Sequence, residues 1–475
     1  MSKKNFYITT SIAYTNSLPH IGFALESIQA DVIARYQQIQ NRNVFFLTGT
    51  DEHGAKVVKA AEIAGKNPKK FVDEISTEFR KLTQILNLSN NDFIRTTDQK
   101  KHWPTVKKVW LKLKENGDIY KKKYQGLYCI GCEAFITKKD LKNGKCLFHQ
   151  KEPEIIEEEN YFFRLSKYSK KIEEIIKKDK IKIIPKSRKN EILNFIKQGL
   201  EDISFSRPRK DLKWAIPVPD DSAASIYVWA DALTNYISAL GYAKNSQKFK
   251  KYWPADVHCL GKDILKFHVL IWPGMLLSLK LPLPKTLFVH GFITVNGQKM
   301  SKSLGNVINP FELIEKYGID AVRYFLLREI SPTEDGDFTY QKFEERYNAD
   351  LANGLGNLVA RVITMAEKLK TKNEKRKTTT KNLKFINNIR KRYKKALDEF
   401  KFNEALIAIW ELIGFCDKYI EKEKPWEIKN EEVIYNLLFF LNEISKLLEP
   451  FLPEASEKIL EQIKTRKSKP LFPRI

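Results

Sequence analysis

The stretch NFYITTSIAYTNSLPHIGF, residues 5–23, decides the fold. Its first part, Phe6–Thr10, is short, aromatic and β-branched, which predicts a buried strand. Pro19 and Gly22 interrupt this pattern before a helical run begins. Six apolar residues of that run share one face at three- and four-residue steps: Ala24, Leu25, Ile28, Val32, Ile33 and Tyr36. Four polar residues fall elsewhere around the helix: Glu26, Gln29, Arg35 and Gln38. The sequence therefore predicts a strand, a loop and an amphipathic helix.

A second strand is predicted over Val44–Thr48, followed by the loop GTDEHG at 49–54 and a helix over Ala55–Ala64. Two parallel strands joined by a crossover helix form a βαβ unit. Open α/β sheets bind their ligands at the carboxyl ends of such strands. We therefore expect a Rossmann-like parallel sheet, with the polar loops around His20 and Asp51 at the same edge.

The start of the first helix is a candidate anion site. Free backbone N–H groups and the helix dipole favour a negative charge there, and Gly22 allows a ring or a phosphate to approach the backbone closely. His20 would stand beside that anion. The alternative is that His20 merely caps the helix or packs against it, so the signal depends on the motifs that follow.

Composition and charge limit the class of protein. A chain of 475 residues with 43% apolar and 12% aromatic residues is expected to form two to four globular domains. The formal net charge of +25 suits a polyanionic partner such as nucleic acid, although a Lys-rich vocabulary can also reflect biased nucleotide composition. The longest apolar run, Val269–Leu283, is interrupted, and the N-terminus leads into no signal-peptide core. We expect a cytoplasmic protein that does not enter a membrane.

The pattern along the chain predicts five segments. Strands are predicted over Ile226–Trp229, Val257–Leu260 and Thr286–His290, and only helices from residue 350 onward. The segments are a first α/β half at 1–117, an inserted module at 118–225, a second α/β half at 226–295, a basic loop and its surroundings at 296–349, and an all-α tail at 350–475.

Four residues of the inserted module have the spacing of a metal site. Cys129 and Cys132 form one ligand pair, and Cys146 and His149 form another after thirteen intervening residues. Four nitrogen and sulfur ligands at this spacing suit a closed tetrahedral zinc ion with a structural role. The alternative, unrelated surface thiols, would leave reactive cysteines exposed.

A basic loop follows the last predicted strand. Lys299 and Lys302 are separated by Met300 and Ser301, and Ser303 and glycines flank them. Such a loop could neutralise charge on a transferring phosphoryl group. On residue types alone, an ordinary exposed Lys/Ser loop would also fit.

Taken together, the two loops resemble a known family. The segments His20-Ile-Gly-Phe23 and Lys299-Met-Ser-Lys-Ser303 resemble the HIGH and KMSKS signatures of class I aminoacyl-tRNA synthetases. Over essentially all 475 residues the chain is similar to the methionyl-tRNA synthetase family, in its single-zinc-knuckle branch. The motifs that carry this similarity are Pro19–Gly22, Phe46–Gly54, Tyr227–Ala232, Gly261–Ile264 and Gly297–Asn306.

The resemblance implies a function and a set of site residues. The family joins L-methionine to tRNA(Met), elongator and initiator, through a methionyl-adenylate made with ATP and Mg²⁺. The catalytic residues implied are His20, Gly22, Lys299 and Lys302. The ATP-binding residues implied are these four with Gly261, Asp263, Met300, Ser301 and Ser303. The methionine-binding residues implied are Ile12, Tyr14, Asp51, Trp229, Ala232, Leu233, Tyr236, Ile264, Phe267 and His268. The implied anticodon-binding residues of the helical tail are Asn357, Arg361 and Trp426.

Two other functions stay open from the sequence. The chain could activate another apolar amino acid, although such synthetases usually carry an editing insertion larger than residues 118–225. It could also be a catalytically impaired paralogue that keeps zinc and tRNA. Because the chain stops soon after the helical tail, we expect a monomer.

Phe23 departs from the signature, which usually has a second histidine there. A phenyl ring donates no hydrogen bond to a phosphate, and loss of one such donor can slow a reaction roughly 100-fold. Because the other motif positions are present, we expect backbone amides and Lys302 to suffice. Phe23→His should then change single-turnover adenylation less than about 10-fold. A gain near 100-fold in the variant would show an impaired parent site.

Overall fold

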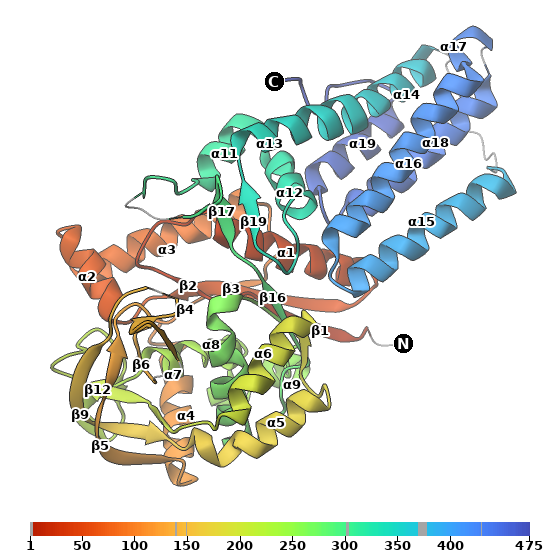
Figure 1. Cartoon of the computed structure of the whole chain (residues 1–475). Helices are drawn as coiled ribbons and strands as arrows, with labels where there is room; N and C mark the ends of the chain where they lie inside the picture. The colour runs from red at the N-terminus through yellow and green to blue at the C-terminus, as the bar shows by residue number, and fades with distance from the viewer. Residues whose placement is uncertain (1–2, 138–139, 149, 301–303, 369–377, 429) are drawn as a thin grey trace. The chain divides into compact units, whose positions relative to one another are not determined.

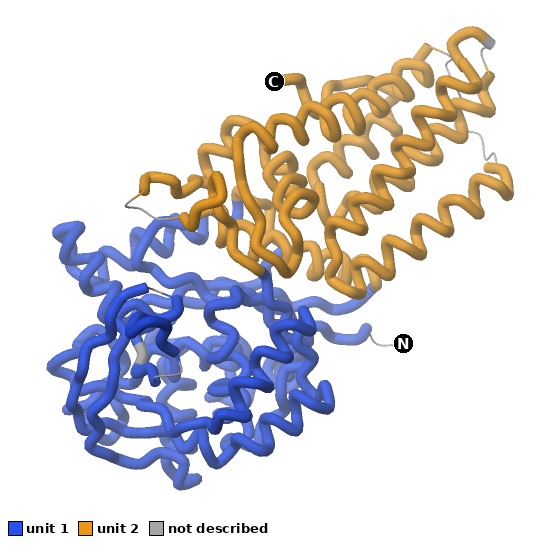
Figure 2. Tube along the Cα trace, in the orientation of Figure 1, with its two compact units in different colours: residues 1–19, 41–84, 89–290 blue, residues 20–40, 85–88, 291–475 orange. Residues whose placement is uncertain are grey.

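The computed structural model describes residues 3–137, 140–148, 150–300, 304–368, 378–428 and 430–475. These residues form two compact units (Figure 2). Unit 1 contains residues 1–19, 41–84 and 89–290, and unit 2 contains residues 20–40, 85–88 and 291–475. Four of the predicted site residues, His149, Ser301, Lys302 and Ser303, lie outside the described residues.

A seven-stranded parallel sheet forms the centre of unit 1 (Figure 1). Strand β1 (Asn5–Thr9) lies between β3 (Asn43–Asp51) and β15 (Val257–Gly261), and β16 (Thr286–His290) pairs with β15. Strands buried on both faces are typical of parallel sheets, and the apolar residues of β1 and β15 are buried. The predicted Rossmann-like parallel sheet is therefore confirmed, as are the strands near residues 6, 44, 257 and 286.

Unit 1 contains further elements beside these four strands. They are β2 (Ala13–Tyr14), α2 (Ala55–Ile63), α3 (Pro68–Ile85), β4 (Asp92–Arg95), α4 (Trp103–Glu115), β5 (Ile119–Cys129), β6 (Ala134–Ile136), β7 (Leu141–Lys142), β8 (Lys145–Cys146), β9 (Glu154–Phe163), η2 (Leu165–Tyr168), α5 (Ser169–Lys177), β10 (Lys182–Ile184), α6 (Lys186–Lys197), β11 (Ile203–Ser204), β12 (Ser206–Pro208), β13 (Pro217–Val218), β14 (Asp221–Ile226), α7 (Val228–Ala232), α8 (Asn235–Ser238), η3 (Tyr242–Lys244), α9 (Gln247–Tyr252), η4 (Lys262–Ile264), η5 (Phe267–Ile271) and α10 (Trp272–Ser278).

The strand predicted over Ile226–Trp229 is wrong. Ile226 ends β14, which belongs to a separate three-stranded antiparallel sheet, and Tyr227 precedes the short helix α7. The β-branched and aromatic residues of this run favour a strand locally. Here these residues are buried in the core of unit 1 as part of a helical turn. Tertiary packing can override a weak local preference for a strand in this way.

The range predicted as an insertion, 118–225, contains its own antiparallel sheet. Strands β5 and β9 pair along ten residues, from Ile119–Phe163 to Tyr128–Glu154. One strand of the range nevertheless belongs to the main sheet, because β10 pairs in parallel with β16 at its edge. The β-branched segment at 182–184 thus continues the α/β layer from within the range.

Unit 2 contains one long helix from the N-terminal part and the entire C-terminal part. Its elements are α1 (Ile21–Ile39), β17 (Ile293–Val295), β18 (Gln298–Lys299), α11 (Pro310–Tyr317), α12 (Ile319–Arg328), β19 (Gly336–Phe338), α13 (Tyr340–Arg346), η7 (Tyr347–Gly356), α14 (Asn357–Lys368), α15 (Thr380–Asp398), α16 (Phe402–Glu423), α17 (Pro425–Ile428), α18 (Glu431–Leu448) and α19 (Pro453–Thr465). After residue 350 the described residues form helices and no strand, as predicted. No helix among the described residues is long and apolar enough to cross a membrane.

Helix α1 is buried on more sides than its sequence pattern predicts. Glu26 and Gln29 were expected away from the core, yet both are buried. Within unit 2, the Gln29 side-chain amide donates to the carbonyl of Pro332. The amphipathic pattern identified the helix correctly but understated how much of it is covered.

Arg323 of α12 links three segments of unit 2 from a completely buried position. Its guanidinium donates to the carboxylate of Asp31 in α1 at 2.8 Å. It also donates to the carbonyl oxygens of Leu86, Pro450 and Phe451 at 2.7–3.1 Å. A buried charge with every partner satisfied specifies how these segments pack.

Replacing Arg323 with Met should lower the free energy of unfolding by about 3 kcal/mol, because Asp31 and three carbonyls lose a buried donor. The matched control is Arg392→Met, which removes an exposed ion pair with Glu411 and should cost below about 1 kcal/mol. Urea unfolding followed by circular dichroism measures both changes. Equal shifts in the two variants would contradict the assigned role of Arg323.

Candidate active site

His20 is the N-cap of helix α1. Its backbone is extended, with φ −131° and ψ 173°, and its ring atom Nδ1 accepts a hydrogen bond from the Gly22 amide at 3.0 Å. A Cβ on Gly22 would lie 2.8 Å from the His20 ring, so glycine is needed for the ring to reach this position. The space beside Gly22, which the sequence left open for a ligand, is thus filled by His20.

The expectation of free amides at the start of α1 is wrong. The Ile21 amide donates to the carbonyl of Ile308, the Gly22 amide donates to His20, and the amides of Phe23 and Ala24 donate to the His20 carbonyl. Burial lowers the pKa of His20, which favours a neutral ring. Since Nδ1 accepts, the proton of the neutral ring lies on Nε2. His20 therefore presents one N–H donor where the sequence predicted backbone donors.

The basic loop comes close to this helix start within unit 2. Strand β18 ends at the exposed Lys299, and the Asn306 side chain donates to the Lys299 carbonyl at 3.3 Å. The methyl carbon of Met300 lies 3.8 Å from the place a Cβ on Gly22 would occupy. The two signature segments, almost 280 residues apart in sequence, are therefore neighbours in space.

Asp51 ends strand β3 in unit 1 and is only 7% exposed. Its backbone carbonyl accepts from the amide and the hydroxyl of Thr15, both at 3.0 Å. Its side-chain oxygen Oδ1 is buried and has no hydrogen-bond partner among the described residues. Burial raises the pKa of Asp51, and the carboxylates of Asp231 and Glu133 raise it further. A cation at Oδ1 would relieve both effects.

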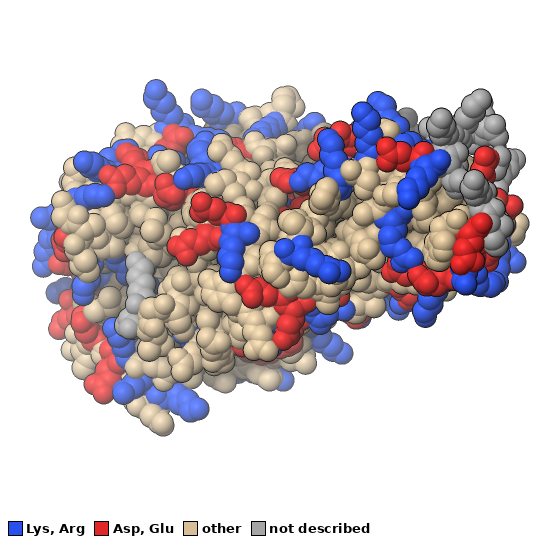
Figure 3. All heavy atoms as spheres, turned by 90° about the horizontal axis from the view of Figure 1, so that it is seen from above, with Lys and Arg blue, Asp and Glu red and all other residues tan. Residues whose placement is uncertain are grey.

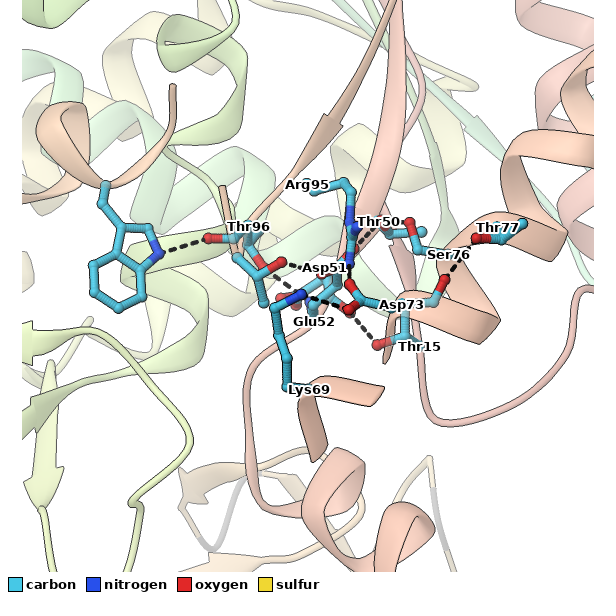
Figure 4. Close-up of polar contacts among 12 residues, drawn as sticks. Thr15, Thr50, Asp51, Glu52, Lys69, Asp73, Ser76, Thr77, Arg95 and Thr96 are labelled. Atoms are coloured by element: carbon cyan, nitrogen blue, oxygen red, sulfur yellow. Dashed lines mark hydrogen bonds and ion pairs between the residues drawn. The ribbon is translucent and has the colours of Figure 1, made fainter. Parts of the chain in front are cut away.

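The neighbouring Glu52 anchors the loop that carries Asp51 (Figure 4). Arg95 donates two parallel hydrogen bonds to its carboxylate, at 2.7 and 2.8 Å, and a third at 2.5 Å to Asp73. The Glu52 amide donates to the hydroxyl of Thr96. Bidentate pairs of this kind fix geometry strongly. Asp51 is thus held by a rigid network in which the adjacent acid is fully paired.

Asp231 lies between two histidines in unit 1 and is 1% exposed. His53 Nδ1 and His102 Nε2 each lie 2.7 Å from one of its carboxylate oxygens. Burial alone would raise the pKa of Asp231, but the two histidines lower it below its usual value. Asp231 is therefore an ionised, fully partnered group, in contrast to Asp51.

Aromatic residues expected to bind methionine gather in unit 1. The rings of Trp229 and Phe267 stack at 3.8 Å with an angle of 7°. The Tyr236 hydroxyl lies 2.7 Å from His268 Nε2, and His268 Nδ1 lies 3.0 Å from the carbonyl of Ile264. Because that carbonyl can only accept, Nδ1 carries a proton, and the Tyr236 hydroxyl donates to Nε2.

The remaining residues of the predicted sites lie as follows. Ile12, Trp229, Ile264 and Phe267 pack against the main core of unit 1, to which Leu233 and Tyr236 belong, and Ala232 is buried. Asp263 lies in η4, and its carboxylate comes within 2.8 Å of the place a Cβ on Gly261 would fill. His290, which the sequence did not indicate, lies beside Gly261.

Three of the four predicted metal ligands come together. The sulfur atoms of Cys129, Cys132 and Cys146 all lie within 4.8 Å of one another, and those of Cys132 and Cys146 are 3.6 Å apart. The Cys132 amide also donates to the Cys129 sulfur. Burial and the neighbouring thiols raise the pKa of Cys132, so three thiolates at this spacing need a cation. The cluster is a candidate metal centre.

The predicted anticodon residues lie on the helical tail. Asn357 begins α14 and is exposed, and Arg361 follows one turn later. The Arg361 guanidinium donates to Glu421 at 2.6 Å and lies 3.7 Å from Asp417, so a ligand would compete with these acids. Trp426 of α17 is 48% exposed, which is unusual for such a large aromatic residue.

The face of the molecule shown in Figure 3 has charged side chains of both signs. On the face shown in Figure 3, Lys and Arg side chains alternate with Asp and Glu side chains and form no single basic field. On this face, no basic patch of the described residues marks a nucleic-acid surface.

Comparison with known families defines the class. The model described as tRNA synthetases class I (M) matches residues 6–140 and 131–363, and the model described as anticodon-binding domain of tRNA ligase matches residues 381–472. Together they cover the parallel sheet, both signature loops and the helical tail. The chain therefore belongs to the class I tRNA synthetases.

Individual relatives define the family more narrowly. The chain is 45% identical to a methionine–tRNA ligase of Caldanaerobacter subterraneus over 97% of this chain and 74% of that one. It is 44% identical to that of Thermotoga maritima over 96% and 75%. A Mycobacterium tuberculosis methionyl-tRNA synthetase in complex with methionyl-adenylate superposes with a TM-score of 0.91 at 37% identity, over 96% of this chain and 93% of that one. The chain belongs to the methionyl-tRNA synthetase family.

The sequence missed several polar residues around Asp51. His53 was visible within the quoted motif, but nothing in the sequence paired it with Asp231 or brought His102 to the same carboxylate. Arg95 lies in β4, a short strand that was not predicted from the sequence. Only the sheet brings these residues to one place.

Asp51→Asn should raise the KM for methionine roughly 30-fold or more, because a truncated charge pair typically costs 2–5 kcal/mol, and leave the KM for ATP nearly unchanged. Only ionised Asp51 pairs with an ammonium group. Since its pKa is raised, parent affinity for methionine should weaken as pH falls through that pKa, whereas the variant should show no such step.

Exchange of pyrophosphate into ATP between pH 5.5 and 8 measures both effects. Asp73→Asn, a half-exposed acid of the same network, is the matched control. A parent profile identical to that of Asp51→Asn would refute the assignment.

Proposed function

We propose that the chain activates L-methionine with ATP and transfers the methionyl group to tRNA(Met), both elongator and initiator. The observation that carries the methionine site is the buried Asp51 oxygen without a partner, in the unit that also contains the stacked Trp229 and Phe267. An α-ammonium group supplies the missing cation, and a thioether is favoured against aromatic rings by about 0.3–1.5 kcal/mol.

The first step needs no protein nucleophile. A carboxylate oxygen of methionine attacks the α-phosphorus in line. A new O–P bond forms, and the bond between the α-phosphorus and the leaving pyrophosphate breaks. The protein therefore positions the reactants and stabilises charge. His20 Nε2–H would donate to a phosphate oxygen, and Lys299 and Lys302 would neutralise pyrophosphate together with Mg²⁺.

The nucleoside part of ATP would be held by a second group of residues. Asp263 suits a ribose hydroxyl, because its carboxylate accepts two hydrogen bonds and Gly261 leaves room beside it. Gly22 would allow the His20 ring to adopt its donor position. Met300, Ser301 and Ser303 would complete the loop that covers the phosphates.

The cysteine cluster would hold one structural zinc ion, with His149 as the fourth ligand. Three thiols within 4.8 Å of one another fit a tetrahedral ion with sulfur ligands. Such an ion would bind the thiolates, offset the burial and the neighbouring thiols that raise the pKa of Cys132, and stabilise a loop whose own hydrophobic cluster is small.

The helical tail would read the anticodon. Trp426, half exposed after Pro425, can stack on an unpaired base, and Asn357 and Arg361 can hydrogen-bond base edges. To bind a base, Arg361 would have to leave its acidic partners, Glu421 and Asp417.

One assay tests the proposal against its alternatives. ATP–pyrophosphate exchange is measured with each of the amino acids in turn. Methionine alone should support exchange. Exchange with another apolar amino acid would favour a synthetase of different specificity, and exchange with none would favour an impaired paralogue.

Trp426→Ala should spare methionine-dependent exchange within about 2-fold and reduce aminoacylation of tRNA roughly 5- to 150-fold, since one base stack is worth 1–3 kcal/mol. Leu383→Ala removes another exposed apolar side chain of the same bundle and serves as the control. Equal loss of both activities in Trp426→Ala would indicate a folding defect instead.

A further inference from the structure

Glu133 is a buried acid that the proposed mechanism does not use. It directly follows Cys132 in the metal-binding loop, but it is not one of the clustered thiol ligands. Its φ of 49° is in the left-handed region, which few non-glycine residues adopt, and its side chain is only 5% exposed. A strained, buried carboxylate in a loop requires strong partners.

Its partners belong to two distant segments of unit 1. The Tyr14 hydroxyl of β2 donates to one carboxylate oxygen, and the Lys56 amide in the first turn of α2 donates to the other at 2.8 Å. Helix α2 has Gly54 as its N-cap, which supplies no side-chain acceptor. Glu133 therefore caps α2 from a position 77 residues further along the chain.

Gly54 shows how closely these groups meet. A Cβ at Gly54 would overlap the Tyr14 hydroxyl and would lie 2.9 and 3.0 Å from the Glu133 carboxylate oxygens. The backbone of Gly54, with φ +116°, also excludes other residues. The loop also binds this region a second time, since the Lys56 ammonium donates to the Gly131 carbonyl.

The contacts of Glu133 involve or adjoin two residues expected to bind methionine. Tyr14 is the register partner of Asp51 across β2 and β3, and Gly54 follows Asp51 by three residues. Glu133 thus holds the hydroxyl of one methionine-site residue and the helix that follows the other. Loss of this carboxylate would free the Tyr14 hydroxyl and uncap helix α2, which begins four residues after Asp51.

We propose that Glu133 is a positioning residue of the methionine site, through which the metal-binding loop holds Tyr14 and the first turn of α2 in place. This inference rests on the proposed function of Tyr14 and Asp51 in binding methionine. It makes the inserted loop part of amino-acid recognition and not only a separate structural module.

The experiment compares Glu133→Ala, Glu133→Gln and the control Glu157→Ala, an exposed acid of β9. The KM values for methionine and for ATP are measured by pyrophosphate exchange, and bound zinc is measured by metal analysis. Glu133→Ala should raise the KM for methionine about 10-fold, because the loss of one buried hydrogen bond typically costs about 1.4 kcal/mol. The KM for ATP should stay within about 2-fold of the parent value, and zinc should be retained. Glu133→Gln keeps an acceptor oxygen and should recover most of the loss.

Three results would overturn the proposal. The first is an unchanged methionine KM in Glu133→Ala. The second is an equal rise of both KM values with loss of zinc, which indicates a merely structural role. The third is absence of methionine-dependent exchange in the parent. This result would refute the proposed function as well, and it differs from the first two, in which the parent is active.

If Glu133→Ala is insoluble, Glu133→Leu, which has a similar volume but accepts no hydrogen bond, is combined with Tyr14→Phe. The double variant should raise the methionine KM no more than the larger single change does, because both single changes remove the hydrogen bond between Tyr14 and Glu133. Additive effects would contradict the proposal.

Discussion

The parallel pairing of β1 with β3 is the constraint on which the site depends. Strand β2, which follows β1, pairs in turn with the end of β3, so that Tyr14 lies opposite Asp51 and the polar segments after β1 and β3 meet at one edge of the sheet. The loops that follow the strands lie at the carboxyl edge of a parallel sheet, where such folds place their polar site residues. Buried acids can therefore lie at this edge. Two residues of the proposed methionine site, Tyr14 and Asp51, lie at that edge.

The buried acids around this edge differ in how they are balanced. Glu52 has Arg95, Asp231 has two histidines, and Glu133 has a helix N-terminus and a tyrosine. Asp51 alone among these four keeps a buried oxygen that has no hydrogen-bond partner among the described residues. A buried carboxylate without a cation is costly. In the proposed methionine site, this arrangement would favour a ligand that brings its own positive charge.

Helix α1 illustrates a second use of burial. Its first amides are satisfied within the protein, and the acceptor role of His20 Nδ1 leaves the Nε2 proton as the outward donor. A neutral imidazole whose ring is held in place can donate a hydrogen bond to a phosphate oxygen without being protonated first. The loop with the cysteine cluster acts in a comparable way, since its Glu133 completes a helix cap elsewhere in unit 1. Both segments supply order to the proposed chemistry rather than a reacting atom.

The sequence by itself determined the local elements and the short-range motifs. The strand near residue 6, the α1 pattern, the cysteine spacing and the helical tail follow from periodicity, propensity and ligand spacing, which act over a few residues. Only the tertiary structure decided that Val228 begins a helix, that β10 joins the main sheet, and that Glu26 is buried. It alone brought His102 to Asp231 and Glu133 to Tyr14, because contacts between residues more than a hundred positions apart depend on the packing of whole layers and leave no local pattern in the chain.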